Sequence, residues 1–237
     1  NEFKMNTMKK IMFFVLLLTV TISAFGQSDV TKFLGIPVDG FKSEMIQKLK
    51  EKGFVNSTLH EDILEGEFNG RDVYISAVTN NNKVYRIFLK DKVNVDEGQI
   101  KTRFNTLCKQ FKENSKYISL GNYEISEDED ISYEMSVNNK RYEAIFYQKP
   151  ILTDSIETVK RVKESLDKAL QKHSVSEEEL ENATEDVEKE ILKSTILYAM
   201  EWASKKAVWF SISESYGEYY ISMYYDNEYN KANGEDL

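Results

Sequence analysis

The sequence predicts an α+β protein in which helices pack on one face of a largely antiparallel sheet. Several segments repeat apolar residues at helical spacing, and others alternate apolar with polar residues as half-buried strands do. Short turns rich in asparagine and glycine join those strands into hairpins, and hairpins pair antiparallel. The expected order of elements is α-βββ-α-βββ-α-α-ββ.

The first half of the chain has the pattern of a helix followed by a three-stranded meander. Met45 and Leu49 repeat at helical spacing and Gly53 is typical of the position just past a helix end, which predicts a helix over 41–52. Asn69-Gly70 is the strongest short signal for a hairpin turn. Strands are expected at 65–68, 71–79 and 84–89.

The next segment shows similar patterns. One apolar stripe, which includes Phe104 and Cys108, predicts a helix over 97–115. Apolar residues then alternate with Ser and Glu over 131–137, which predicts a strand buried on one face. Further strands are expected at 118–125 and 142–146. Residues 39–92 and 96–149 are therefore candidates for a tandem α-βββ repeat.

The C-terminal third predicts two helices and a hairpin. An apolar stripe indicates a helix over 155–172, and the capping pair Ser176 and Glu179 starts another helix that is expected to run to about residue 205. Alternation over 208–225 predicts the final hairpin. These elements form a block at 155–226 within one mature domain, 27–237.

The N-terminus is typical of a secretory signal peptide. Lys9 and Lys10 precede an apolar run over 11–20, and Ala24-Phe25-Gly26 supplies the small residues of a cleavage site. The run is shorter than the roughly 20 apolar residues that span a bilayer. We expect residues 1–26 to be removed after Gly26, which would leave a periplasmic or extracellular protein without a transmembrane segment.

The amino-acid composition argues against several classes of partner and cofactor. The chain has 31 Lys+Arg against 40 Asp+Glu, a net charge of −9, which argues against a nucleic-acid partner. One Cys and two His are too few for a typical zinc site, and no phosphate-binding loop or hydrolase motif occurs. We therefore expect no metal and no cofactor, and we expect Cys108 to be a buried core thiol.

The many Asp and Glu residues leave open the alternative that the protein is a hydrolase. Four acids on predicted strands are candidates for the paired acids of a glycan-directed hydrolase: Glu67, Glu134, Glu143 and Glu214. No motif singles out a pair, so no catalytic residue is assigned. The acidic run 127–130 lacks the spacing of an EF-hand loop and is more typical of a solvated loop.

Aromatic residues crowd the final hairpin and supply the candidate binding residues. Alternation places Trp209, Tyr220 and Tyr224 on the face opposite Phe210 and Ile221, and polar-tipped rings suit protein interfaces and sugar stacking. In the alternative interpretation, helices cover both faces and the rings are core. The full candidate set is Trp209, Tyr216, Tyr220, Tyr224 and Tyr229.

Two resemblances add to this interpretation. The stretch 33–40, the helix ending at 52–54, and the C-terminal stretches 225–230 and 233–237 resemble uncharacterised secreted proteins of Bacteroides and Prevotella, which implies a Gram-negative source and export. Asp39-Gly40 before a helix also resembles the entry to β-lactamase-inhibitor-protein-like α+β folds, which implies a helix before an antiparallel meander. Neither resemblance implies binding residues.

Together these features predict an exported, non-enzymatic binding or interaction module of a Gram-negative envelope, with a protein or a glycan as its partner. A secreted hydrolase and a structural envelope protein are the alternatives.

Overall fold

The computed structural model describes residues 30–149, 155–181 and 183–232, so the expected signal peptide lies outside the described residues. Contacts divide the chain into a helical unit, 149–204, and a sheet unit, 30–148 with 205–237. The expected block 155–226 is split between the two units, because its helices belong to the first and its hairpin to the second.

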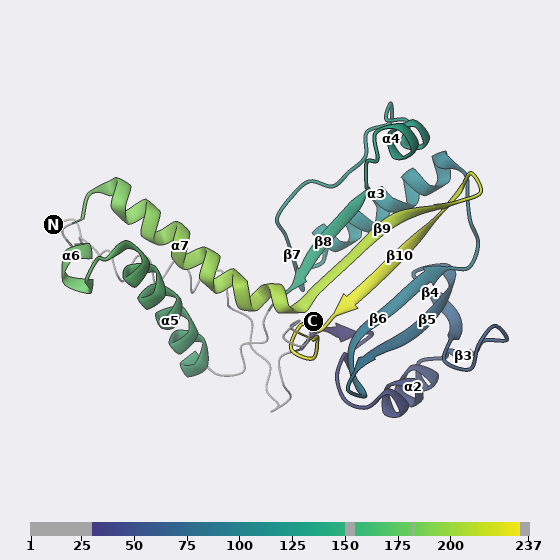
Figure 1. The fold of residues 1–237 in the computed structure, drawn as a ribbon, viewed down its shortest axis with the longest axis horizontal. Coiled ribbons are helices and arrows are strands. Elements are labelled where there is room, and N and C mark those ends of the chain that lie inside the picture. The colour runs from purple at the N-terminus through teal and green to yellow at the C-terminus, as the bar shows by residue number, and fades with distance from the viewer. Residues whose placement is uncertain (1–29, 150–154, 182, 233–237) are drawn as a thin grey trace. The chain divides into compact units, whose positions relative to one another are not determined.

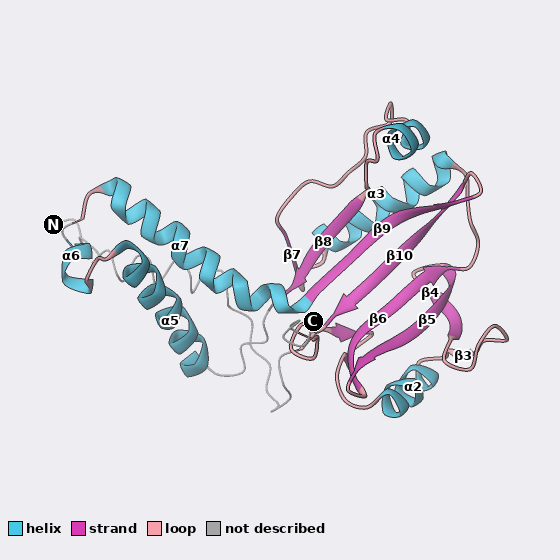
Figure 2. Ribbon diagram, viewed as in Figure 1, coloured by secondary structure: helices cyan, strands magenta, loops and turns pink. Residues whose placement is uncertain are grey.

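The sheet unit is built on eight antiparallel strands, which confirms the predicted α+β class (Figures 1 and 2). A two-stranded sheet and three helices complete this unit. In spatial order the strands are β3 (Val55–Asn56), β4 (Leu64–Phe68), β5 (Arg71–Asn80), β6 (Lys83–Asp91), β10 (Glu218–Asp226), β9 (Ala207–Ser215), β8 (Glu143–Gln148) and β7 (Tyr117–Ser119). The other elements are β1 (Lys32–Phe33), β2 (Ile36–Pro37), α2 (Lys42–Glu51), α3 (Glu97–Glu113) and α4 (Ile131–Val137).

Tight turns determine how the strands pair. Asn69-Gly70, Asn81-Asn82 and Tyr216-Gly217 all have positive φ at both central residues, which is the backbone of a type I′ hairpin turn. The two-residue loops match the right-handed twist of the strands. The β5–β6 hairpin also contains a register shift, between Val78 and Thr79. The hairpins predicted from these turns are confirmed.

One face of the sheet carries the core. Five residues lie opposite one another across β5, β6, β10, β9 and β8, and all of them are buried: Ile75, Leu89, Met223, Phe210 and Ala144. The buried side chains of α2, such as Leu49, and of α3, such as Phe104, belong to the same cluster. Helix α2 contacts β5 and β6, while α3 contacts β7 and β10.

The predicted strand over 131–137 is wrong, because this segment forms α4. Ile131 and Met135 satisfy both a two-residue and a four-residue spacing, so periodicity alone is ambiguous here. Local hydrogen bonds favour the helix, since the Asp130 carboxylate accepts from the Tyr133 amide at 2.8 Å and Glu97 Oε1 accepts from the Ile131 amide at 2.8 Å. The strand expected at 118–125 is limited to β7, and the tandem repeat stays a prediction.

The helical unit contains α5 (Ser155–His173), α6 (Glu177–Glu181) and α7 (Glu185–Ala203). Ser176 and Glu179 form the predicted capping box, with both reciprocal hydrogen bonds present. The single helix predicted from 177 to about 205 is wrong, because Ala183 and Thr184 are not helical and a new helix starts at Glu185. None of the described helices is long and apolar enough to cross a bilayer.

We predict that Asp226→Asn weakens the sheet unit. Asp226 accepts two hydrogen bonds from Arg86, at 2.6 and 2.7 Å, and its side chain is only 5% exposed. Removing the carboxylate charge leaves a half-buried guanidinium without its counterion, which we expect to lower the free energy of unfolding by about 2–3 kcal/mol. Urea denaturation followed by tryptophan fluorescence measures this.

Glu228→Gln is the matched control, because it removes the same charge from an exposed pair with Lys231 at 3.2 Å. We expect it to change the unfolding free energy by less than about 0.5 kcal/mol. Equal effects of the two substitutions would show that the Arg86–Asp226 pair does not hold the sheet.

Candidate binding surface

The face of the sheet opposite the core, which we call the outer face, carries a row of aromatic side chains. Phe88, Tyr224 and Trp209 lie opposite one another on β6, β10 and β9, and Ile145 on β8 extends the row. These side chains are half-buried, whereas their neighbours along each strand are buried in the core. Alternation along the paired strands therefore separates the two faces, although Ser222 and Asp226 on the outer side of β10 are also buried.

The rings of this row pack against one another. Trp209 and Tyr224 are stacked, with ring centroids 3.8 Å apart and an interplanar angle of 13°. Phe88 lies 5.1 Å from Tyr224 at 38°. Directly opposed cross-strand pairs of this kind stabilise a sheet and restrict the rotamers of the rings. The row is thus rigid before any partner arrives.

Arg86 and Asp226 hold one end of the row. The Arg86 guanidinium lies 4.9 Å from the Tyr224 ring centre and 5.5 Å from that of Trp209. Asp226 accepts from Arg86 and also from the Trp209 indole N–H at 3.0 Å. The hydrogen bonds to Asp226 raise the pKa of Arg86 above its usual value. One buried carboxylate therefore orients both a cation and a ring.

Lysines cover the neighbouring tyrosines. Lys90 Nζ lies 4.0 Å from the ring centre of Tyr220, and Lys92 Nζ lies 5.2 Å from that of Tyr74. Lys92 also pairs with Glu65 at 3.1 Å. The positive charges of the outer face are thus held next to rings or carboxylates, which lowers the cost of covering them.

The structure brings together three of the five candidate residues. Trp209, Tyr220 and Tyr224 share the outer face, as alternation predicted. Tyr216 is fully exposed in the β9–β10 turn, and Tyr229 is 48% exposed beyond β10 with Lys205 Nζ 5.0 Å from its ring centre. Phe88, Arg86 and Lys90 were missed, because only the pairing of β6 with β10 places them beside the candidates.

The four acids considered for hydrolysis do not form a site. Glu67, Glu143 and Glu214 are exposed on three different strands, and Glu134 lies on α4 rather than on a strand. Glu214 accepts from the Gly217 amide at 2.5 Å and Glu134 accepts from Asn138 at 2.9 Å, so both serve local structure.

A serine–histidine–glutamate arrangement in the helical unit was not expected from the sequence. His173 Nε2 lies 2.9 Å from Ser194 Oγ, and His173 Nδ1 lies 3.8 Å from Glu190. Ser194 is only 6% exposed and lies inside α7, where backbone N–H groups are bonded within the helix and cannot form an oxyanion hole. The arrangement links α5 to α7.

The acidic run 127–130 also has structural roles. Glu129 accepts hydrogen bonds from Lys140 and from the Tyr142 hydroxyl, and Asp130 caps α4. Within the described part of the chain, no group of three or more His, Cys, Asp or Glu residues is arranged to hold a metal ion.

We predict that Cys108 does not react with thiol reagents in the folded protein. It is 3% exposed on α3, and burial raises its pKa to about 12, so roughly one thiol in ten thousand is ionised at pH 8. DTNB should label it only after unfolding in guanidinium chloride. Lys109→Cys in a Cys108→Ala background is the control, since this exposed neighbour on the same helix should react at once. Equally fast labelling of native Cys108 would contradict its burial.

No family model, curated protein or solved structure matches the chain.

Proposed function

We propose that the chain is an exported, non-catalytic interaction module of a Gram-negative envelope that binds a protein partner through the outer face. The observation that carries this proposal is the ordered aromatic row Phe88–Tyr224–Trp209, which is flanked by the Arg86–Asp226 pair and by Tyr220 with Lys90 over its ring. Aromatic residues and arginine are enriched at protein interfaces. Their rigidity means that little side-chain entropy is lost when they are covered.

The ring arrangement favours a protein over a glycan. Sugars stack on free aromatic faces, but Trp209 and Tyr224 cover each other, and Lys90 lies over Tyr220. The remaining ring edges and hydroxyl groups suit the mixed apolar and hydrogen-bonding surface of a folded protein or an extended peptide.

The size of the outer face is compatible with part of a protein interface. The row crosses four strands at about 4.8 Å spacing and so extends about 14 Å, and a strand of nine residues extends about 30 Å. The product, on the order of 400 Å², is about half of the roughly 800 Å² per partner of a standard protein interface, so a partner of standard size would also cover residues beyond the row.

Export rests on the N-terminal pattern of basic, apolar and small residues. We predict that the protein recovered from the envelope begins at Gln27. Mass spectrometry of the intact protein and its N-terminal peptide measures this. An uncleaved chain in the cytoplasmic fraction would contradict export. It would not contradict binding through the outer face, which the crosslinking experiment tests separately.

We predict that a photo-crosslinking amino acid at Tyr220 captures a protein in the living host. Benzoylphenylalanine at this position lies on the outer face and reports only contacts within reach of the ring. The control position is Tyr133, which is 53% exposed on α4 in the same unit. We expect one defined crosslinked protein from position 220 and none from position 133.

The affinity of the purified protein for this captured partner is then measured. Tyr220→Ala should weaken its binding about tenfold or more, while Tyr133→Ala should leave it unchanged. Equal crosslinking from both positions, or none from 220, would contradict a protein interface on the outer face. Binding of isolated glycans that Tyr220→Ala abolishes would instead support the glycan alternative.

A further inference from the structure

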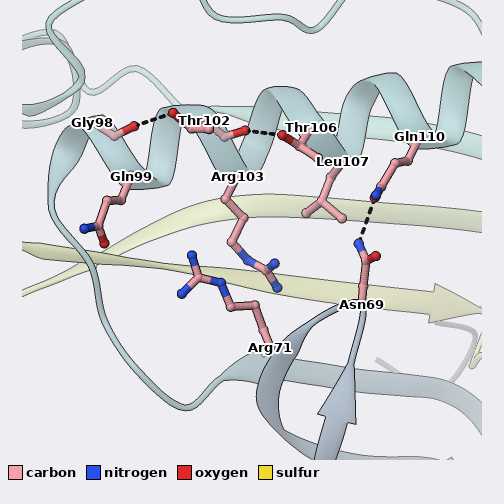
Figure 3. Close-up of a pocket in the computed structure, with 9 residues that line it drawn as sticks. All are labelled: Asn69, Arg71, Gly98, Gln99, Thr102, Arg103, Thr106, Leu107 and Gln110. Atoms are coloured by element: carbon pink, nitrogen blue, oxygen red, sulfur yellow. Dashed lines mark hydrogen bonds between the residues drawn. The ribbon is translucent and has the colours of Figure 1, made fainter.

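A cavity of about 350 Å³ lies between α3 and the turn that joins β4 to β5 (Figure 3). We call it the α3 pocket. Helix α3 packs on the core side of the sheet, so this pocket is separate from the outer face. Its lining combines polar side chains of α3 with Asn69 of the turn and Arg71 of β5.

Local structure explains why polar side chains meet here. The pocket residues of α3 recur every three or four positions from Gln99 to Gln110, which places them on one side of the helix. Arg71 begins β5 and has the same orientation as buried Val73, so its side chain points to the helix side of the sheet. The Asn69-Gly70 turn brings Asn69 within 2.8 Å of the Gln110 side chain.

The pocket carries an uncompensated positive charge. Arg103 is neutralised by Asp91, which accepts two hydrogen bonds from it at 2.6 and 2.7 Å. The Arg71 side chain points toward Arg103 and makes no ion pair or hydrogen bond within the described residues (Figure 3). No Asp or Glu lines the cavity, although the chain has a net charge of −9.

Neutral groups in the pocket offer both donors and acceptors. The hydroxyl groups of Thr102 and Thr106 donate to helix carbonyls four residues earlier, at 2.9 and 2.7 Å, which leaves their oxygen lone pairs as acceptors. Gln110 accepts from Asn69 and keeps its amide N–H groups as donors. Such a lining can bond several hydroxyl groups on one ligand.

We propose that the α3 pocket binds a small hydroxylated oxyanion of about monosaccharide size, such as a sugar acid or a sugar phosphate. Arg71 holds the carboxylate or phosphate group through its planar donor fork, which matches both. Thr102, Thr106 and Gln110 bond the hydroxyl groups. The volume of the pocket is at the lower end of those typical of small-molecule sites and is sufficient for a single sugar unit.

Calorimetric titration of the whole mature chain tests this with four probes: glucuronate, glucose 6-phosphate, glucose and inorganic phosphate. We expect at least one of the anions to bind with a dissociation constant on the order of 1 mM, and glucose to bind at least tenfold more weakly, because it lacks the group that Arg71 holds. The ratio between the two anions identifies the preferred oxyanion.

Two variants assign the binding to the pocket. Arg71→Gln should raise the dissociation constant about tenfold or more without changing the melting temperature, since Arg71 supports no other described residue. Arg141→Gln removes the same charge from an exposed loop and should bind like the wild type. Thr102→Val should weaken the sugar anions but not inorganic phosphate, because it removes only a hydroxyl contact.

Three results would overturn the proposal. They are binding of neither anion by the wild type, equal losses in Arg71→Gln and Arg141→Gln, and binding of glucose as tight as that of the anions. Each is independent of the outer face, so Tyr220→Ala should leave anion binding intact.

Discussion

The pairing of β6 with β10 is the constraint on which the rest of the structure depends. These strands join the two halves of the sheet, and the chain closes a long loop to pair them, since Arg86 and Asp226 are 140 positions apart in sequence. Their register places Phe88 opposite Tyr224 and Leu89 opposite Met223. A slip of one residue would turn Tyr224 into the core and Met223 outward, which would remove both the aromatic row and the core contacts at once.

Two arginine–aspartate pairs lie at the ends of this junction and counter such a slip. Arg86 and Asp226 face each other across it on the outer face. At the other end, Asp91 of β6 accepts from Arg103 of α3 and from the Ile221 amide of β10 at 3.2 Å. Buried pairs of this kind repay their desolvation only when both partners are in place. They therefore add little to the stability of a correct pairing, but they strongly penalise a wrong one.

Local sequence patterns were sufficient to predict most secondary-structure elements of the sheet unit. Tertiary contacts determine the elements and strand pairings that these patterns did not predict. Met45 and Leu49, the alternation along β5, and the Asn69-Gly70 turn each agree with one structure only, so helix, strand and hairpin were predictable. The pattern of segment 131–137 agrees with both a strand and a helix. Glu97, a residue distant in sequence, helps to favour the helix by accepting a hydrogen bond from the Ile131 amide. The candidate binding surface could likewise be predicted only in part, because part of it depends on contacts between segments distant in sequence. Alternation placed Trp209, Tyr220 and Tyr224 together, but nothing local indicates that β6 is their neighbour.

The same dependence explains why the resemblance motifs lie where they do. The stretches 33–40 and 225–230 meet in the fold, because Asn227 donates to the Val38 carbonyl at 2.7 Å and Asn230 donates to the Asp39 carboxylate at 2.7 Å. These side chains attach the N-terminal hairpin to the end of β10, next to Asp226. The two stretches therefore contribute to closing the sheet.

The two candidate surfaces differ in how charge is arranged, and this follows from the fold. On the outer face Arg86 and Lys92 are paired with carboxylates, and Lys90 lies over the ring of Tyr220. At the α3 pocket, Arg103 is paired with Asp91, which lies outside the lining and also accepts from the Ile221 amide, and no carboxylate of the lining is left to pair with Arg71. The chain as a whole repels anions, but at physiological salt that repulsion is screened beyond about 8 Å. Short-range contacts inside the cavity must then decide whether an anion stays.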